Sequence, residues 1–185
     1  MDSLRRTYIK EGVLDVRIRV LFLILGIIIL FILRPEIARQ NYNRALSFLN
    51  IEDENQAIFH LRKCLIAFPR FLPAYERLGE IFEIKKECKK AISAYKKMIK
   101  IEPLSPRGYL NLGRFYVVRK GNYQEAVKWF YFALAQDEKN WEAYRWLAIC
   151  YRNLGKNNLA LSIYQKMKKE FPYDKRIDVF IKRLK

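Results

Sequence analysis

Hydrophobic residues recur at helical spacing along most of the chain. From about residue 37 to the C-terminus, apolar positions fall three or four residues apart, and short polar stretches rich in glycine, proline or asparagine interrupt them. Before this region, residues 20–33 form an uncharged apolar run, VLFLILGIIILFIL. The pattern predicts an all-α chain, in which one wholly apolar helix precedes a series of short amphipathic helices.

A small residue recurs in every second amphipathic helix. Ala57, Ala91, Ala126 and Ala160 are separated by 34, 35 and 34 residues, and each is followed four positions later by a bulky apolar residue. A small residue allows two helices to approach closely, and the bulky neighbour fills the space around the contact. The spacing predicts a helix–turn–helix unit that occurs four times and is too small to bury its apolar face alone.

The first helix of each unit carries a second motif. It reads Tyr75-x2-Leu78-Gly79-x2-Phe82, Tyr109-x2-Leu112-Gly113-x2-Tyr116 and Tyr144-x2-Leu147-Ala148-x2-Tyr151. With the Ala-x3-bulky motif and the prolines at positions 69, 103 and 172, this pattern resembles the tetratricopeptide repeat. The resemblance implies a right-handed solenoid of about four repeats, at 38–71, 72–105, 106–140 and 141–174.

Two of the repeats depart from the family pattern. In the first, Asn41, Arg44 and Ala45 stand where the aromatic residue, the leucine and the glycine are expected. In the third, Glu138 replaces the closing proline. The second, third and fourth repeats therefore carry the resemblance, and the first is recognised mainly by its second helix.

The apolar run is a candidate membrane anchor. As a helix, its 14 residues extend about 21 Å, which is shorter than the roughly 30 Å hydrocarbon layer. Starting at Ile18, with flanking arginines reaching toward headgroups, closes most of this gap. Because no small-x-small cleavage site follows, we expect an uncleaved signal anchor at 18–34, after a basic tail at 1–17. The expected anchor residues include Val20, Phe22, Gly26 and Phe31. A signal peptide, or an apolar helix buried against another protein, is the alternative.

The boundaries of the repeat domain follow from local signals. Pro35 is expected to begin a short junction, so the domain spans 35–174. Ser105-Pro106 and Asn140 are expected to cap helices. Apolar residues at helical spacing after Asp174 predict a capping helix at 175–185, which covers the last repeat and keeps a basic outer face that includes Arg183.

Charge limits the classes of partner. The chain has 36 Lys and Arg against 19 Asp and Glu, a net charge of +17, and most of this excess lies in the repeat domain. Such a field favours acidic proteins, anionic lipid or nucleic acid. Five basic residues lie within 15 positions before the apolar run and three lie within 15 positions after it. This asymmetry favours a cytoplasmic N-terminus and a periplasmic repeat domain, although three cysteines without CxxC spacing and the basic domain argue the other way.

In a tetratricopeptide solenoid, residues between the motif positions of the first helices line a concave groove. Arg107 and Arg114 lie seven residues apart, as do Arg145 and Arg152, so each pair shares one helix face. Their forked donors suit carboxylates. The alternative is that they pair with Glu142 or with glutamates of the second repeat, or are solvated. The full set of candidate groove residues is Glu76, Glu80, Glu83, Arg107, Leu110, Arg114, Arg145, Ile149, Arg152 and Asn153.

The resulting hypothesis is a non-catalytic interaction scaffold. The sequence has no nucleophile motif, phosphate loop or metal-ligand spacing, and its only histidine is His60. We therefore expect no enzyme activity, no cofactor and no small-molecule substrate. The scaffold would sit in a bacterial inner membrane as a subunit of a secretion, cell-envelope or flagellar motor assembly, and would bind proteins with acidic segments. The alternative is a basic helical-repeat module that binds nucleic acid or acidic peptides on the cytoplasmic face.

Overall fold

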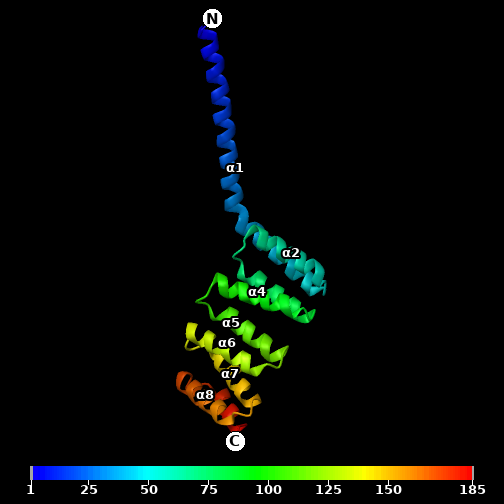
Figure 1. The fold of residues 1–185 in the computed structure, drawn as a ribbon, viewed down its shortest axis with the longest axis vertical. Coiled ribbons are helices and arrows are strands. Elements are labelled where there is room, and N and C mark those ends of the chain that lie inside the picture. Colours follow the sequence, from blue (N-terminus) through cyan, green and yellow to red (C-terminus); the bar gives the residue numbers. More distant parts are fainter. Residues whose placement is uncertain (1, 185) are drawn as a thin grey trace. The chain divides into compact units, whose positions relative to one another are not determined.

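The computed structural model describes residues 2–184, with side chains for 20–29 and 31–184. Within this range every regular element is an α-helix, as the periodicity predicts. The chain divides into two compact units, Met1–Pro69 and Arg70–Lys185, and Figure 1 shows the helices of both.

The first unit holds two helices, α1 (Asp2–Asn50) and α2 (Glu54–Ala67). The junction expected at Pro35 is wrong, because Pro35 lies inside α1 and the helix continues to Asn50. A proline removes one backbone hydrogen bond and crowds the preceding turn, which bends a helix without necessarily ending it. Figure 1 shows this outcome, since α1 changes direction between its blue and cyan portions. Residues 2–17 of the tail expected at 1–17 belong to α1, and the side chains of the tail lie outside the described part.

The C-terminal part of α1 and the helix α2 form an antiparallel hairpin. Ala38 and Ala45 are buried on α1, opposite buried Ala57 and Leu61 on α2. Across the hairpin, His60 Nδ1 lies 3.3 Å from Asn41 Oδ1, and its ring stacks on Phe48 at 5.3 Å. The first repeat thus forms its hairpin with alanines where the motif residues are missing.

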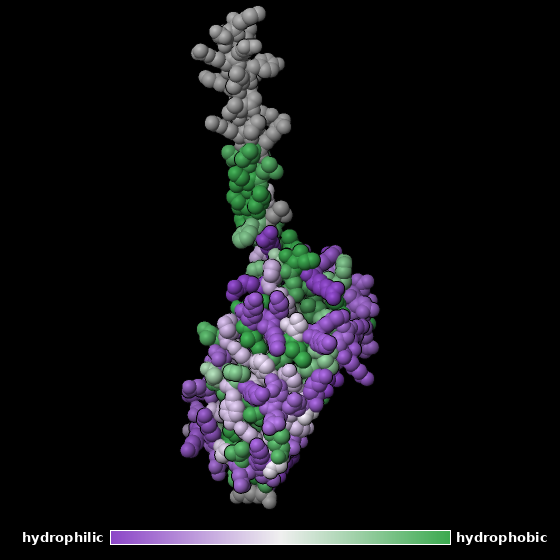
Figure 2. All heavy atoms as spheres, in the orientation of Figure 1, coloured by the Kyte–Doolittle hydropathy of each residue, from purple (hydrophilic) through white to green (hydrophobic). Residues whose placement is uncertain are grey.

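The apolar portion of α1 is exposed. Phe22 and Phe31 are each 68% exposed, and Val20 is 47% exposed. Nothing lies within 4 Å of the position that a Cβ on Gly26 would take. Figure 2 shows this portion as a continuous hydrophobic surface. By length and composition, the helix from Val20 onward, in which an 18-residue window has a mean hydropathy of 2.5, can cross a membrane, a property that signal sequences share.

The second unit contains three further hairpins and a final helix. The hairpins are α3 (Leu72–Ile84) with α4 (Cys88–Ile101), α5 (Pro106–Val118) with α6 (Tyr123–Gln136), and α7 (Trp141–Asn153) with α8 (Asn157–Glu170). The final helix, α9 (Lys175–Lys182), buries Ile177 and stacks Phe180 on Tyr164 at 5.5 Å. Helical hairpins followed by a capping helix are the predicted fold class.

Two glycines explain why the hairpins close tightly. A Cβ at Gly79 would lie 2.3 Å from the ring of Tyr95, and one at Gly113 would lie 2.6 Å from the ring of Phe130. The glycine of the first helix therefore receives the aromatic ring of the second helix. This contact explains why the first-helix motif carries a glycine and why the second-helix motif carries an aromatic residue.

Helix starts agree with the sequence in one case and differ in another. Asn140 caps α7, with its side chain accepting a hydrogen bond from the backbone N–H of Ala143 at 2.9 Å. Ser105 stands before α5, but its side chain makes no capping hydrogen bond. Pro106 at the helix start has no N–H to satisfy and its fixed φ suits the first turn, so α5 begins there without a side-chain cap.

Candidate functional site

The first helices of the second unit, α3, α5 and α7, present the candidate groove residues. Their motif residues point the other way, as shown by the buried Leu78, Leu112 and Leu147. Helical geometry then places the intervening positions on the opposite face. We call this face the first-helix groove.

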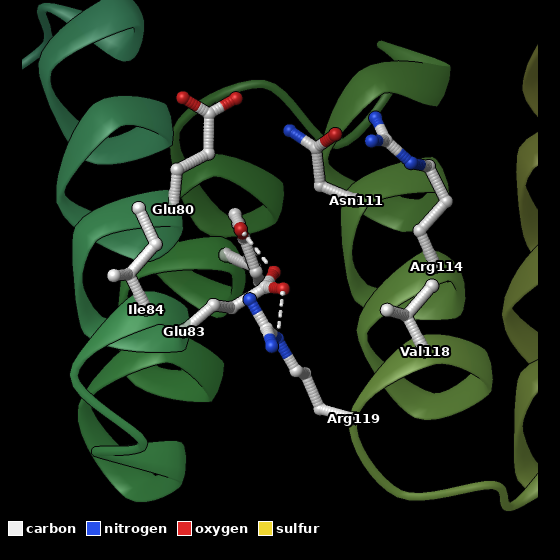
Figure 3. Close-up of a pocket in the computed structure, with 8 residues that line it drawn as sticks. Glu80, Glu83, Ile84, Asn111, Arg114, Val118 and Arg119 are labelled. Atoms are coloured by element: carbon white, nitrogen blue, oxygen red, sulfur yellow. Dashed lines mark hydrogen bonds and ion pairs between the residues drawn. The ribbon is translucent and has the colours of Figure 1, made fainter.

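One cavity of about 400 Å³ lies between α3 and α5 (Figure 3). Glu83 is held from two sides within it. Tyr95 Oη donates a hydrogen bond to Glu83 at 2.6 Å, and Arg119 Nε donates another at 3.2 Å. Burial and the bond to Glu83 raise the pKa of Tyr95 above its ordinary value, so the phenol remains a neutral donor. Glu80 and Arg114 also line this cavity, which therefore has acidic and basic walls.

The arginine expected at the start of this groove already has a partner. Arg107 forms a two-bond ion pair with Glu76, whose carboxylate also accepts a hydrogen bond from Asn111 Nδ2 at 2.9 Å. Glu76 is only 14% exposed as a side chain, so the pair is partly shielded from water. Arg114 lies 4.0 Å from Glu142. Arg107 therefore follows the alternative given in the sequence analysis, in which the groove arginines pair with glutamates of the second repeat.

A second cavity of about 180 Å³ lies where α7, α8 and α9 meet. Apolar side chains line it together with three arginines. Among the described residues, the guanidinium groups of Arg145, Arg152 and Arg183 make no hydrogen bond and no ion pair. Arg145 rests near the ring of Trp146 at 5.5 Å. The apolar lining is Ile149, Tyr164, Phe180 and Leu184.

Three sequence expectations are corrected or refined at these positions. Leu110 is buried, at 8% exposure, in a core cluster that also contains Tyr144 and Leu147 of the next first helix, α7. Asn153 is exposed and its amide donates to the carbonyl of Ile149 within α7. Arg183, expected on the outer face of the cap, lines the second cavity. The spacing of Phe180 and Arg183, one turn apart on a helix, could have indicated that placement.

Two of the free cysteines in the described part of the chain, Cys64 and Cys150, are buried. No three histidine, cysteine, aspartate or glutamate side chains there are placed to hold a metal ion. Burial raises the pKa of Cys64 to about 11 and that of Cys150 to about 12. These thiols stay protonated at neutral pH, which is the unreactive form.

Comparisons with solved structures agree with the fold. PilF from Pseudomonas aeruginosa has a TM-score of 0.66 at 21% identity, over 82% of this chain and 68% of that one. PilW, described as a widely conserved type IV pilus biogenesis factor, has a TM-score of 0.61 at 23% identity, over 73% of this chain and 62% of its own length. YrrB, described as a tetratricopeptide protein with an unusual peptide-binding site, gives 0.54 at 20% identity, over 71% and 68%.

Family descriptions identify the same repeats. Two family models, both described as "Tetratricopeptide repeat", match the chain, one at residues 72–103 and the other at residues 118–178. No curated protein matches the sequence. The matched ranges include the first-helix motifs of the second and fourth repeats and the Gly79–Tyr95 contact, whereas Gly113 lies between the two ranges. The chain belongs to the tetratricopeptide repeat family.

Proposed function

We propose that this protein is a non-catalytic scaffold, anchored in a bacterial inner membrane by α1, that binds an acidic segment of a protein partner where α7 of the first-helix groove borders the second cavity. Proteins of this repeat family bind other proteins, and YrrB, of similar fold, is described as having a peptide-binding site. PilW, also similar in fold, is described as a pilus biogenesis factor. These descriptions support a role as a subunit of an envelope-associated assembly.

The single observation that carries the proposal is the second cavity. Its arginines, Arg145, Arg152 and Arg183, make no hydrogen bond or ion pair among the described residues, whereas Arg107 is already paired with Glu76. Guanidinium groups that surround an apolar floor can bind a carboxylate while the floor accepts a neighbouring apolar side chain. An acidic segment with interspersed aliphatic residues has this combination.

The test measures binding of a short fluorescent peptide in which glutamate and leucine alternate. We expect full-length protein to bind it, with an affinity that falls as salt rises. Because charge reversal replaces attraction by repulsion, Arg145→Glu with Arg152→Glu should weaken binding by about tenfold or more. Fluorescence anisotropy measures the affinity, and circular dichroism checks that the helices remain.

Matched controls separate a site from general charge attraction. Lys89→Glu with Lys97→Glu makes the same change in net charge on exposed positions of α4, and should leave most of the affinity. A peptide with glutamine in place of glutamate should not bind. If the α4 variant loses as much affinity as the groove variant, or if single-stranded DNA competes equally well, the proposed site is wrong.

A further inference from the structure

The outer face of α2 carries an unusual strip of exposed residues. Phe59, Arg62, Lys63 and Ile66 are spaced at i, i+3, i+4 and i+7, so they share one side of the helix. Phe59 is 50% exposed and Ile66 is 81% exposed. The opposite side of α2 is the one that packs on α1, through Leu61 among others. We call these four residues the α2 strip.

The chemistry of the α2 strip differs from that of an ordinary solvated face. The ammonium of Lys63 lies over the ring of Phe59 at 4.4 Å, so an aromatic ring and a cation form one surface. A large aliphatic side chain follows one turn later. Aromatic, aliphatic and basic side chains on one helix face are typical of helices that rest in a membrane interface, with apolar groups dipping inward and cations at the headgroups.

Because the hairpin is antiparallel, the C-terminal end of α2 lies toward the end of the apolar run in α1. His60 contacts Asn41 and Phe48, so it lies beside the middle of the C-terminal portion of α1. Because the helices are antiparallel, the six residues from His60 to Ile66 advance about 9 Å toward the bend in α1. That bend, at Pro35, follows the last residue of the apolar run, Leu33, by two positions.

Charge within the unit is polarised in the same direction. The acidic residues Glu52, Asp53 and Glu54 lie at the turn, which is the end of the hairpin far from the bend. Arg62 and Lys63 lie beyond the middle of α2, toward the bend. Glu36 is the carboxylate nearest the apolar run, and it accepts a hydrogen bond from Gln40 at 3.4 Å. The basic part of α2 therefore faces the level at which α1 would leave a bilayer.

We propose that the α2 strip rests on the anionic headgroup layer of the bilayer that α1 crosses. The inference depends on the anchoring role given to α1 under the proposed function. Interface zones extend roughly 5 to 8 Å beyond each side of the hydrocarbon core, which is within reach of Ile66. Contact there holds the first hairpin against the membrane and fixes how the first repeat leaves it.

The experiment places a photoreactive side chain in full-length protein. Three variants are made, Ile29→benzoylphenylalanine, Ile66→benzoylphenylalanine and Val179→benzoylphenylalanine, and each is reconstituted in vesicles of phosphatidylcholine with phosphatidylglycerol. Position 29 reports insertion of α1. Position 179, on α9 of the second unit and 46% exposed, is the matched exposed control. After illumination, lipid adducts are quantified by mass spectrometry.

Each outcome decides between the two proposals. We expect adducts at positions 29 and 66 and several-fold less at position 179. Adding Arg62→Glu and Lys63→Glu should reduce the adduct at 66 several-fold while leaving that at 29 unchanged, because each basic residue near an anionic surface contributes to attraction. Adducts at position 29 alone would contradict the proposed lipid contact of the α2 strip and would still support membrane anchoring by α1. Absence of adducts at 29 would overturn the anchor itself.

Discussion

At the scale of single residues, the core depends on places where a side chain must be missing. Gly113 receives the ring of Phe130, and a Cβ there would lie 2.6 Å from the ring. Phe130 is fully buried, so its ring has little room to move. In the fourth repeat, Ala148 occupies the equivalent position and is also buried. The same motif position therefore carries no side chain in the second and third repeats and a methyl group in the fourth.

We predict that Gly113→Ala destabilises the second unit. Helix propensity favours alanine by about 0.5 to 1 kcal/mol, but forcing a methyl group into this contact costs about 1 to 3 kcal/mol. The cost of the clash should exceed the gain in helix propensity. The free energy of unfolding should therefore fall by about 1 kcal/mol, and the midpoint of thermal unfolding by a few degrees.

Thermal unfolding of full-length protein in mild detergent, followed by circular dichroism, measures the effect of Gly113→Ala. Adding Phe130→Leu should reduce the clash, so the second change costs less in the alanine background than in the native one. Gly26→Ala, where nothing lies within 4 Å of the added carbon, is the matched control and should not lower the midpoint. Equal losses at both glycines would contradict the packing argument.

The residues of the site were harder to predict than those of the core. Glycine, alanine and aromatic motifs determine which side of a helix is buried, so the core contacts follow from the sequence. The pairing of Arg107 with Glu76 joins residues 31 positions apart on neighbouring hairpins. It depends on how the hairpins are offset, which the motifs do not specify. The placement of Leu110 failed for the same reason, because its burial is set by an adjacent helix.

At the scale of elements, the first helix of every hairpin ends in the same way. The residues that follow these helices, Glu52, Lys86, Gly121 and Gly155, all have positive φ values between 59° and 72°. Their spacings are 34, 35 and 34 residues, the spacing of the alanines. The backbone must turn in the left-handed conformation at each site. Glycine adopts the left-handed conformation without steric cost, which accounts for two of these turns, but nothing in Glu52 or Lys86 signals this conformation.

We predict opposite effects for two substitutions at these turns. A non-glycine residue in the left-handed region costs about 1 kcal/mol, so Lys86→Gly should raise the free energy of unfolding by up to about that amount. Gly155→Ala should lower it by about 1 kcal/mol, although nothing lies within 4 Å of the added carbon. Chemical denaturation of both variants gives the two values. If both substitutions are neutral, backbone strain at these turns is not what limits stability.

At the scale of the whole molecule, the sequence predicts which elements are present better than it predicts where a helix bends or ends. The apolar run, the repeats and the capping helix all follow from hydrophobic spacing. The continuity of α1 through Pro35 does not, because a proline signals a disturbed helix and leaves open whether it ends or bends. The bend matters for function, since it determines where the first hairpin lies relative to the apolar run.

The last prediction concerns the orientation of the chain in the membrane. Five basic residues precede the apolar run within 15 positions and three follow it, so we expect the N-terminus to stay in the cytoplasm and the repeats to cross. A tag after Lys185 should then be digested by protease added to intact spheroplasts. Replacing Arg5, Arg6 and Lys10 by glutamine leaves two basic residues against three, and should protect the tag in part of the population. A tag of the native chain that survives until lysis would reverse the orientation and direct the search for the acidic partner to the cytoplasm.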